Sequence, residues 1–164
     1  WILLNSVNQT SKKFFQSSIG NFSLQILLTL IFFQIILGAF VSGLDAGKIF
    51  QTWPLMNGNY FPDDISKNKF FNFNEPSFVQ FIHRNMAYLI FFISIYVGFN
   101  IYKKKELKLF SKYKLFFFTI MAQILLGVFV LISGLNIFLA SMHQISSIFL
   151  VLTAINLYYS SIST

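Results

Sequence analysis

The chain alternates four long apolar runs with polar connections. The runs cover Ser23–Val41, Phe78–Tyr102, Leu115–Ile132 and Phe138–Tyr159. An α-helix rises about 1.5 Å per residue, so each run is about long enough to cross a hydrocarbon core of roughly 30 Å. The pattern predicts an all-α integral membrane protein whose four transmembrane helices form an up-and-down bundle. We expect residues 1–164 to form a single membrane domain.

The connections between these runs differ in length and composition. Asn5–Asn21 is polar and is predicted to be a loop, and Ser133–Asn136 is predicted to be a tight turn. Residues 44–76, here called the long loop, contain all three prolines and turn signals such as Asn57-Gly58. Loops of this length often carry function, so the long loop is a candidate part of a site.

The composition supports the assignment to membrane proteins and excludes several kinds of metal and cofactor site. Hydrophobic residues make up 55% of the chain, charged residues make up 10%, and the mean hydropathy is +0.66, which is far more apolar than a soluble domain. The absence of cysteine excludes disulfides, zinc–thiolate sites, iron–sulfur clusters and covalent haem attachment. A bound metal therefore needs histidine or oxygen ligands. The chain starts at Trp1, in what reads as the tail of an apolar segment, so we expect it to be part of a longer protein.

The lysines predict how the helices are oriented in the membrane. The formal net charge is +7. Eight lysines lie before the first run or between the second and third: Lys12, Lys13, Lys103, Lys104, Lys105, Lys108, Lys112 and Lys114. By the positive-inside rule these segments and both chain ends are predicted to be cytoplasmic, and the long loop to lie on the outer face. In a membrane protein, an excess of positive charge of this kind reflects the orientation of the helices in the lipid bilayer. We therefore expect no nucleic-acid partner.

An internal repeat relates the two halves of the chain. QIILGAFVSGL at Gln34–Leu44 matches QILLGVFVLISGL at Gln123–Leu135, apart from two inserted residues. Each copy is followed by an outer connection and then by a helix that carries a histidine. The repeat therefore predicts two similar helical hairpins related by a pseudo-twofold axis along the membrane normal. Such an axis would place His83 opposite His143.

The two histidines are the strongest candidates for a site. Ionisable groups in membrane helices are costly and mark functional sites by default. Two imidazoles that face each other across a helical bundle suit the two axial positions of a haem iron. A haem held in this way has no open coordination position and is suited to electron transfer or structural support. The alternative is that His83 and His143 only form hydrogen bonds between helices.

Other residues near the histidines are candidates for supporting roles. Arg84 would either offset the propionates of a haem or serve as an anchor at the membrane interface. Gln34 and Gln123 are predicted to form hydrogen bonds between helices. Four small residues would let a macrocycle approach the backbone, namely Gly38, Ala39, Gly127 and Ala140.

Three segments resemble one known family. They are GAFVSGLDAGKIFQTWPLMNG at Gly38–Gly58, NEPSFVQFIHRNMAYL at Asn74–Leu89 and QILLGVFVLISGLNIFLASMHQ at Gln123–Gln144. In this order they resemble the C-terminal half of haem A synthase of the alphaproteobacterial and mitochondrial type. The resemblance covers nearly the whole chain from about Leu24.

The resemblance implies an eight-helix oxidoreductase of the bacterial inner membrane, built from two similar four-helix halves. The family oxidises the C8 methyl group of haem O to the formyl group of haem A for cytochrome c oxidase assembly. This chain would be the C-terminal half, and haem O would be processed as a substrate by the N-terminal half. The long loop would then be periplasmic.

The resemblance also implies roles for single residues. His83 and His143 would be the axial iron ligands of a b-type haem, with Gln80, Arg84 and Gln144 beside the cofactor. Gln80 stands where the family's N-terminal half has a glutamate, one helical turn before the first histidine. An amide cannot act as a base, so this half would lack the expected catalytic carboxylate.

Two carboxylates of the long loop are the remaining catalytic candidates. Asp45 and Glu75 could supply acid–base chemistry from the outer face, and no other catalytic residue is indicated. Phe50-Gln51 stands where the resemblance predicts Tyr-Asn before TWPLM, which leaves the role of this loop element open.

Two other functions stay open. One is a membrane electron carrier of the cytochrome b type, and the other is a membrane assembly or scaffold protein without haem. The LDAG and TWPLMNG elements favour the synthase, because a simple electron relay does not need such a loop over its cofactor. The expected partners are the lipid bilayer, haem, the N-terminal half, haem O synthase and a second copy of the chain.

Overall fold

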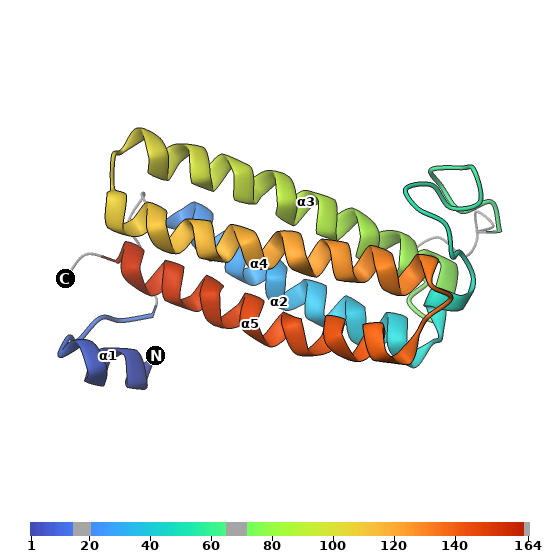
Figure 1. Ribbon diagram of the computed structural model, residues 1–164, viewed down its shortest axis with the longest axis horizontal. Coiled ribbons are helices and arrows are strands. Elements are labelled where there is room, and N and C mark those ends of the chain that lie inside the picture. The colour runs from blue at the N-terminus through green and yellow to red at the C-terminus, as the bar shows by residue number, and fades with distance from the viewer. Residues whose placement is uncertain (15–20, 65–71, 163–164) are drawn as a thin grey trace.

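The computed structural model describes residues 1–14, 21–64 and 72–162. Four long helices lie side by side in a bundle (Figure 1): α2 at Phe22–Gly43, α3 at Pro76–Lys103, α4 at Leu107–Ile132 and α5 at Ile137–Ser161. All four are long and apolar enough to cross a membrane. No strand occurs within the described ranges, so the predicted all-α membrane bundle is confirmed.

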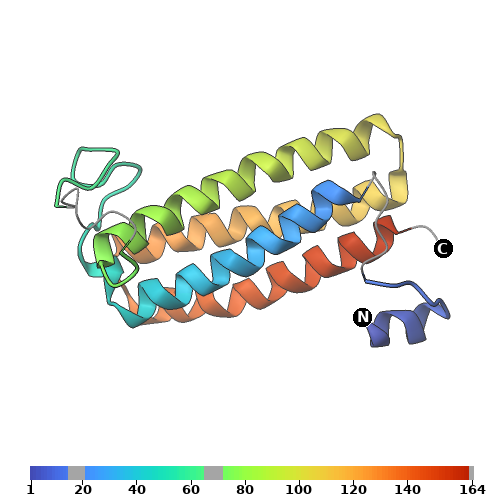
Figure 2. The same ribbon diagram turned by 180° about the vertical axis from the view of Figure 1, so that it is seen from behind.

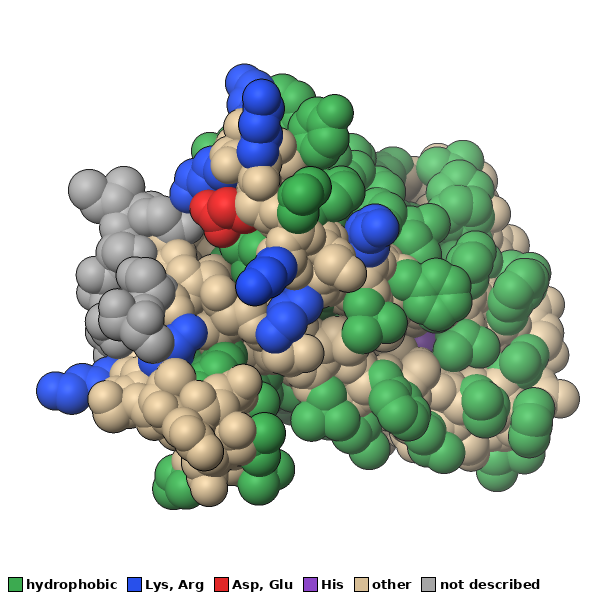
Figure 3. All heavy atoms as spheres, turned by 60° about the vertical axis from the view of Figure 1, so that its left-hand side comes forward, with side chains coloured by type: hydrophobic (Ala, Val, Ile, Leu, Met, Phe, Trp, Pro, Cys, Tyr) green, Lys and Arg blue, Asp and Glu red, His purple; other side chains and the backbone are tan. Residues whose placement is uncertain are grey.

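The connections alternate between the two ends of the bundle, as Figures 1 and 2 show from opposite sides. Helix α1, the end of α5 and the α3–α4 connection lie at one end, here called the lysine end. The long loop and the α4–α5 turn lie at the other, here called the loop end. Lys and Arg side chains gather at the lysine end in Figure 3, whereas the sides of the bundle are mainly hydrophobic. The predicted clustering of lysines at one end is therefore confirmed.

The bundle is built from two hairpins. The most extensive helix contacts lie between α4 and α5 and between α2 and α3, and the contacts between the hairpins are fewer. This arrangement agrees with the repeat in the sequence, whose two copies end α2 and α4.

The beginning of α4 differs from the prediction. The helix begins at Leu107 and not at Leu115. Its first turns carry Lys108 and Lys112 but also bury Leu109 and Tyr113. Because lysine is a good helix former and an apolar stripe packs inward, the helix continues beyond the strictly apolar run.

A short helix replaces part of the predicted N-terminal loop. Helix α1 covers Ile2–Asn8, so the prediction that the loop begins at Asn5 is wrong. The segment is held by long-range contacts that its own sequence does not reveal. The Trp1 ring lies 5.0 Å from that of Tyr159, and the ammonium group of Lys12 donates to the carbonyl of Ile162 at the end of α5.

The described part of the long loop contains short local elements. It contains the 3-10 helix η1 at Ala46–Lys48. A tight turn follows at Asn57-Gly58, where both residues have positive φ and the Met56 and Asn59 backbones bond in both directions. This geometry matches the asparagine–glycine turns of β-hairpins and confirms the predicted turn. The loop ends at Pro76, which occupies the first turn of α3, where a missing N–H has no cost.

The apolar core is concentrated toward the lysine end. In α4 the buried residues end at Ile120, and in α5 they begin at Leu150. In α3 nothing is buried between Gln80 and Ile90. Nearer the loop end, Leu37 of α2 and Ser77–Gln80 of α3 are buried, so the stretch with few fully buried side chains is the middle of the loop-end half. Both histidines lie in this part of the bundle.

Candidate functional site

His83 is held against α2 by one glutamine and one glycine. It lies two turns into α3, after Ser77–Gln80, which are all buried. The Gln34 amide Nε2 donates to the His83 carbonyl at 3.1 Å and lies 3.4 Å from the His83 ring Nε2. Gly38 lies one turn beyond Gln34, and a Cβ atom there would stand 3.4 Å from His83 Cε1. The glycine thus lets the imidazole pack directly against the α2 backbone.

His143 has the same surroundings in the second hairpin. The Gln123 amide Nε2 donates to the His143 carbonyl at 3.0 Å and lies 3.4 Å from the His143 ring Nε2. A Cβ atom on Gly127 would stand 3.0 Å from His143 Cε1. The prediction that both glutamines bond between helices is confirmed. The repeat therefore extends from sequence to the contacts of single side chains.

The two copies differ at the carbonyl end of the glutamine. The hydroxyl of Ser146, one turn after His143, donates to Gln123 Oε1. Gln34 Oε1 is buried and has no hydrogen-bond partner. The carboxamide of Gln123 is therefore held at both of its ends and that of Gln34 at one.

Each imidazole keeps one nitrogen without a protein partner. Nδ1 of His83 and Nδ1 of His143 are buried and make no hydrogen bond. Buried polar atoms normally have a partner, and an exception in a native structure calls for an explanation. Two imidazoles, one from each hairpin and each with one nitrogen that has no protein partner, fit the donor set of a haem iron.

Carboxylates and thiolates do not add to this donor set. Within the described residues, no three His, Cys, Asp or Glu side chains come together as a metal site. A mononuclear site built from protein ligands alone is therefore not formed there. Two histidines are sufficient when a porphyrin supplies the four equatorial nitrogens.

The glycines among the four predicted small residues contact the histidines themselves. Gly38 and Gly127 make room for the imidazole rings, where the sequence prediction expected room for a macrocycle. Ala39 is exposed and Ala140 is partly buried. The contact of these two alanines with a cofactor stays a prediction.

Arg84 and Gln80 fasten the long loop to α3 on either side of His83. Arg84 donates from Nη1 to the Thr52 carbonyl and from Nη2 to the Phe50 carbonyl, both at 2.9 Å. Gln80 Nε2 donates to the same Phe50 carbonyl at 2.9 Å. In the described part of the chain, Arg84 has no carboxylate partner. Its positive charge therefore remains uncompensated near the histidine.

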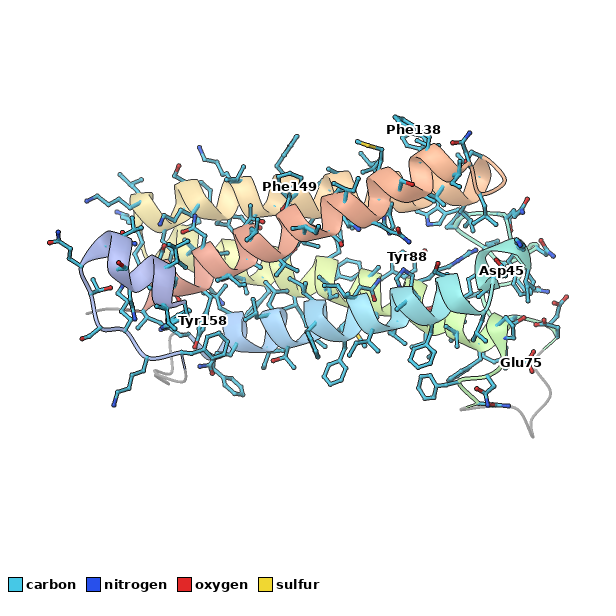
Figure 4. The ribbon with its side chains drawn as sticks, turned by 90° about the horizontal axis from the view of Figure 1, so that it is seen from below. Asp45, Glu75, Tyr88, Phe138, Phe149 and Tyr158 are labelled. Carbon is cyan, nitrogen blue, oxygen red and sulfur yellow. The ribbon has the colours of Figure 1, made fainter. Side chains whose placement is uncertain are left out.

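Asp45 and Glu75 lie at the loop end without forming a cluster (Figure 4). Asp45 is exposed and pairs with Lys48 at 2.9 Å. Glu75 is the N-cap residue of α3. Gln144 is exposed on α5, whereas the adjacent His143 is partly buried. The catalytic roles of Asp45 and Glu75 and the cofactor contact of Gln144 stay predictions.

Sequence reasoning missed the acceptors in the loop. The carbonyls of Phe50 and Thr52 hold Arg84 and Gln80, and a backbone carbonyl has no residue type by which it can be found. The specific partners of Gln34 and Gln123 were also not identified. Their identical positions in the two repeats, each four residues before a glycine, are the signal that points to a shared role.

Comparison with known proteins identifies the relatives of the chain. Residues 1–155 match the family described as cytochrome oxidase assembly protein. A haem A synthase of Pelagibacter ubique is 46% identical over 152 residues, which cover 90% of this chain and 44% of that protein. Haem A synthases of Rickettsia felis and Rickettsia bellii are 36% and 40% identical and cover 82% and 80% of this chain. The chain spans less than half the length of these relatives. No solved structure matches it.

Proposed function

Because the chain belongs to the COX15-CtaA family of cytochrome oxidase assembly proteins, we propose that it is the C-terminal half of a haem A synthase. In this proposal the half forms a single membrane domain and holds a b-type haem. His83 and His143 supply the two axial ligands. The full-length protein is an oxidoreductase that converts the C8 methyl group of haem O into the formyl group of haem A.

One observation carries the proposal. The two hairpins present one histidine each, and each histidine has a buried nitrogen without a partner and a glycine that admits the ring. The surrounding interior lacks the buried side chains that fill the bundle toward the lysine end. A planar apolar group bound there would remove this part of the interior from water and would satisfy both imidazoles.

The residues around the histidines have separate roles in this proposal. A haem with two imidazole ligands supplies one-electron transfer and leaves no open position for oxygen. The Arg84 guanidinium, which has no carboxylate partner in the described ranges, provides positive charge for the propionates. The same side chain and Gln80 hold the long loop over the outer end of the site. The loop thereby limits the access of water to the cofactor.

The oxidation of haem O is assigned to the N-terminal half. Gln80 precedes His83 by nearly one turn and carries an amide, which cannot accept a proton at neutral pH. Asp45 is exposed and already paired with Lys48. The chain described here therefore acts as the cofactor half, and the substrate is processed by the half that precedes it in the relatives.

The proposed location is the inner membrane of a bacterium, with several membrane crossings. The lysine end faces the cytoplasm, because positively charged segments are retained on that side, and the long loop faces the periplasm. The partners are the lipid bilayer, the N-terminal half, haem O synthase and a second copy of the protein.

Haem content tests the proposal. Full-length protein should show a reduced-minus-oxidised spectrum of a six-coordinate b-type haem, and pyridine extraction should identify haem b together with haem O or haem A. His83→Ala and His143→Ala should each abolish haem b retention and leave the protein in the membrane. Unchanged haem b content in either variant would overturn the assignment of that histidine.

A haem held by both histidines would also suit a second candidate, a membrane electron carrier of the cytochrome b type. Such a carrier would bind haem b but would not produce haem A. Expression in a strain that supplies haem O and lacks its own synthase separates the two functions. Haem A in the extracted pigments supports the synthase, and haem b alone supports the carrier.

A further inference from the structure

We propose that Gln34 and Gln123 are positioning residues that fix the planes of the two axial imidazoles. This inference rests on the proposed binding of a haem between His83 and His143. Neither glutamine touches the iron in this assignment. Each acts through the histidine that it contacts.

The geometry shows why the hydrogen bond is not required for the backbone. His83 and His143 lie inside α3 and α5, where each carbonyl already accepts an N–H from the next turn. The additional bonds from Gln34 and Gln123 therefore satisfy no orphaned carbonyl. Their effect is to hold each carboxamide beside an imidazole ring.

The carboxamide and the glycine contact two adjacent atoms at the outer edge of each ring. The amide nitrogen lies 3.4 Å from ring Nε2 in both hairpins. The helix backbone at the glycine, one turn farther on, lies against ring Cε1. Rotation of the ring about its Cβ–Cγ bond would change both of these contacts at once. A carboxamide flip is also disfavoured, because it would place Oε1 against the histidine carbonyl.

The two sites differ in stiffness. Ser146 holds Gln123 Oε1, whereas Gln34 Oε1 has no partner. The orientation of His143 is thus the more strongly fixed of the two. Loss of the Gln123 carboxamide should change the relative angle of the rings more than loss of the Gln34 carboxamide.

Electron paramagnetic resonance gives the decisive measurement. The g-values of a low-spin ferric haem depend on the angle between the planes of its two axial imidazoles. The variants Gln34→Met and Gln123→Met keep side-chain length and remove the N–H donor. Full-length protein carrying either change should retain haem b and show shifted g-values and an altered midpoint potential, with the larger shift in Gln123→Met.

Gln25→Met is the matched control. Gln25 lies on α2 like Gln34 and also bonds between helices, because its Nε2 donates to the Tyr158 hydroxyl at 2.7 Å, but it lies toward the lysine end. A purely structural role for Gln34 predicts the same behaviour in Gln34→Met and Gln25→Met. The proposal predicts wild-type g-values in Gln25→Met only.

A second pair of variants is used if the glutamine variants do not retain haem b. If Gln34→Met or Gln123→Met cannot hold haem b, Gly38→Ala and Gly127→Ala crowd the same rings and leave the carboxamides in place. Shifted g-values in these variants support the proposal. Wild-type g-values in every haem-loaded glutamine or glycine variant would overturn it. Absence of haem b from the wild-type protein would instead overturn the proposed function.

Discussion

The contact between Gly98 and Tyr113 joins the two hairpins near the lysine end, and Gly98→Ala tests how tightly this region is packed. A Cβ atom on Gly98 would lie 2.1 Å from Tyr113 Cζ and 2.2 Å from its hydroxyl oxygen. The ring cannot move freely, because its hydroxyl donates to the Ser94 carbonyl at 3.0 Å and its side chain is buried. The substitution therefore forces α3 and α4 apart or breaks this hydrogen bond.

The expected cost follows from three contributions. Overpacking of a core costs about 1–3 kcal/mol, and loss of a buried hydrogen bond adds about 1 kcal/mol. Alanine is the better helix former by about 1 kcal/mol, which offsets part of this. We expect Gly98→Ala to lower the free energy of unfolding by roughly 1–3 kcal/mol.

Thermal unfolding in detergent, followed by circular dichroism, measures the effect. Gly43→Ala is the control, because a Cβ atom at Gly43 meets nothing within 4 Å. In a double-mutant cycle, Tyr113→Ala should remove the penalty of Gly98→Ala. An unfolding temperature of Gly98→Ala equal to that of Gly43→Ala would refute the close packing described here.

Two further predictions concern the loop and the orientation. Arg84→Met should free the loop segment at Phe50 and Thr52 by removing two hydrogen bonds, at a local cost of about 2–4 kcal/mol, and should speed proteolytic cleavage within the long loop. Lys48→Met breaks only an exposed ion pair and should leave cleavage unchanged; equal rates in both variants would contradict the role of Arg84. Because the chain has no cysteine, single cysteines can map the two ends. A membrane-impermeant maleimide added to spheroplasts should label Asn57→Cys and not Lys104→Cys, and the reverse pattern would contradict a periplasmic long loop.

The sequence predicts the helices better than their contacts. Hydropathy alone identifies four spans, because a membrane helix must be apolar on nearly every side. It places the start of α4 at Leu115 and misses Leu107, because the lysines interrupt the apolar run without interrupting the helix. Helix α1 is missed, since its seven residues depend on contacts of Trp1 and Lys12 with the end of α5.

For the candidate site, the sequence predicts the paired histidines but not the contacts of the long loop. The repeat in the sequence indicates that His83 and His143 are equivalent, and the structure gives them equivalent glutamine and glycine neighbours. The fastening of the long loop by Arg84 could not be predicted, because its acceptors are backbone carbonyls. Side-chain identity predicts which donor is available, but only the fold determines which carbonyl it reaches.

The unequal packing of the two ends connects stability with function. Toward the lysine end, residues such as Phe116, Ile120 and Leu157 form an apolar core that does not depend on a cofactor. Around the histidines the interior side chains are only partly buried. They therefore contribute less packing free energy than the same number of fully buried side chains would. A structure without a ligand gains nothing from this arrangement. It is favourable when a group that binds only the folded state completes the interior, because such binding stabilises the fold by mass action. The core near the lysine end can then hold the two hairpins in register while the site is still being filled.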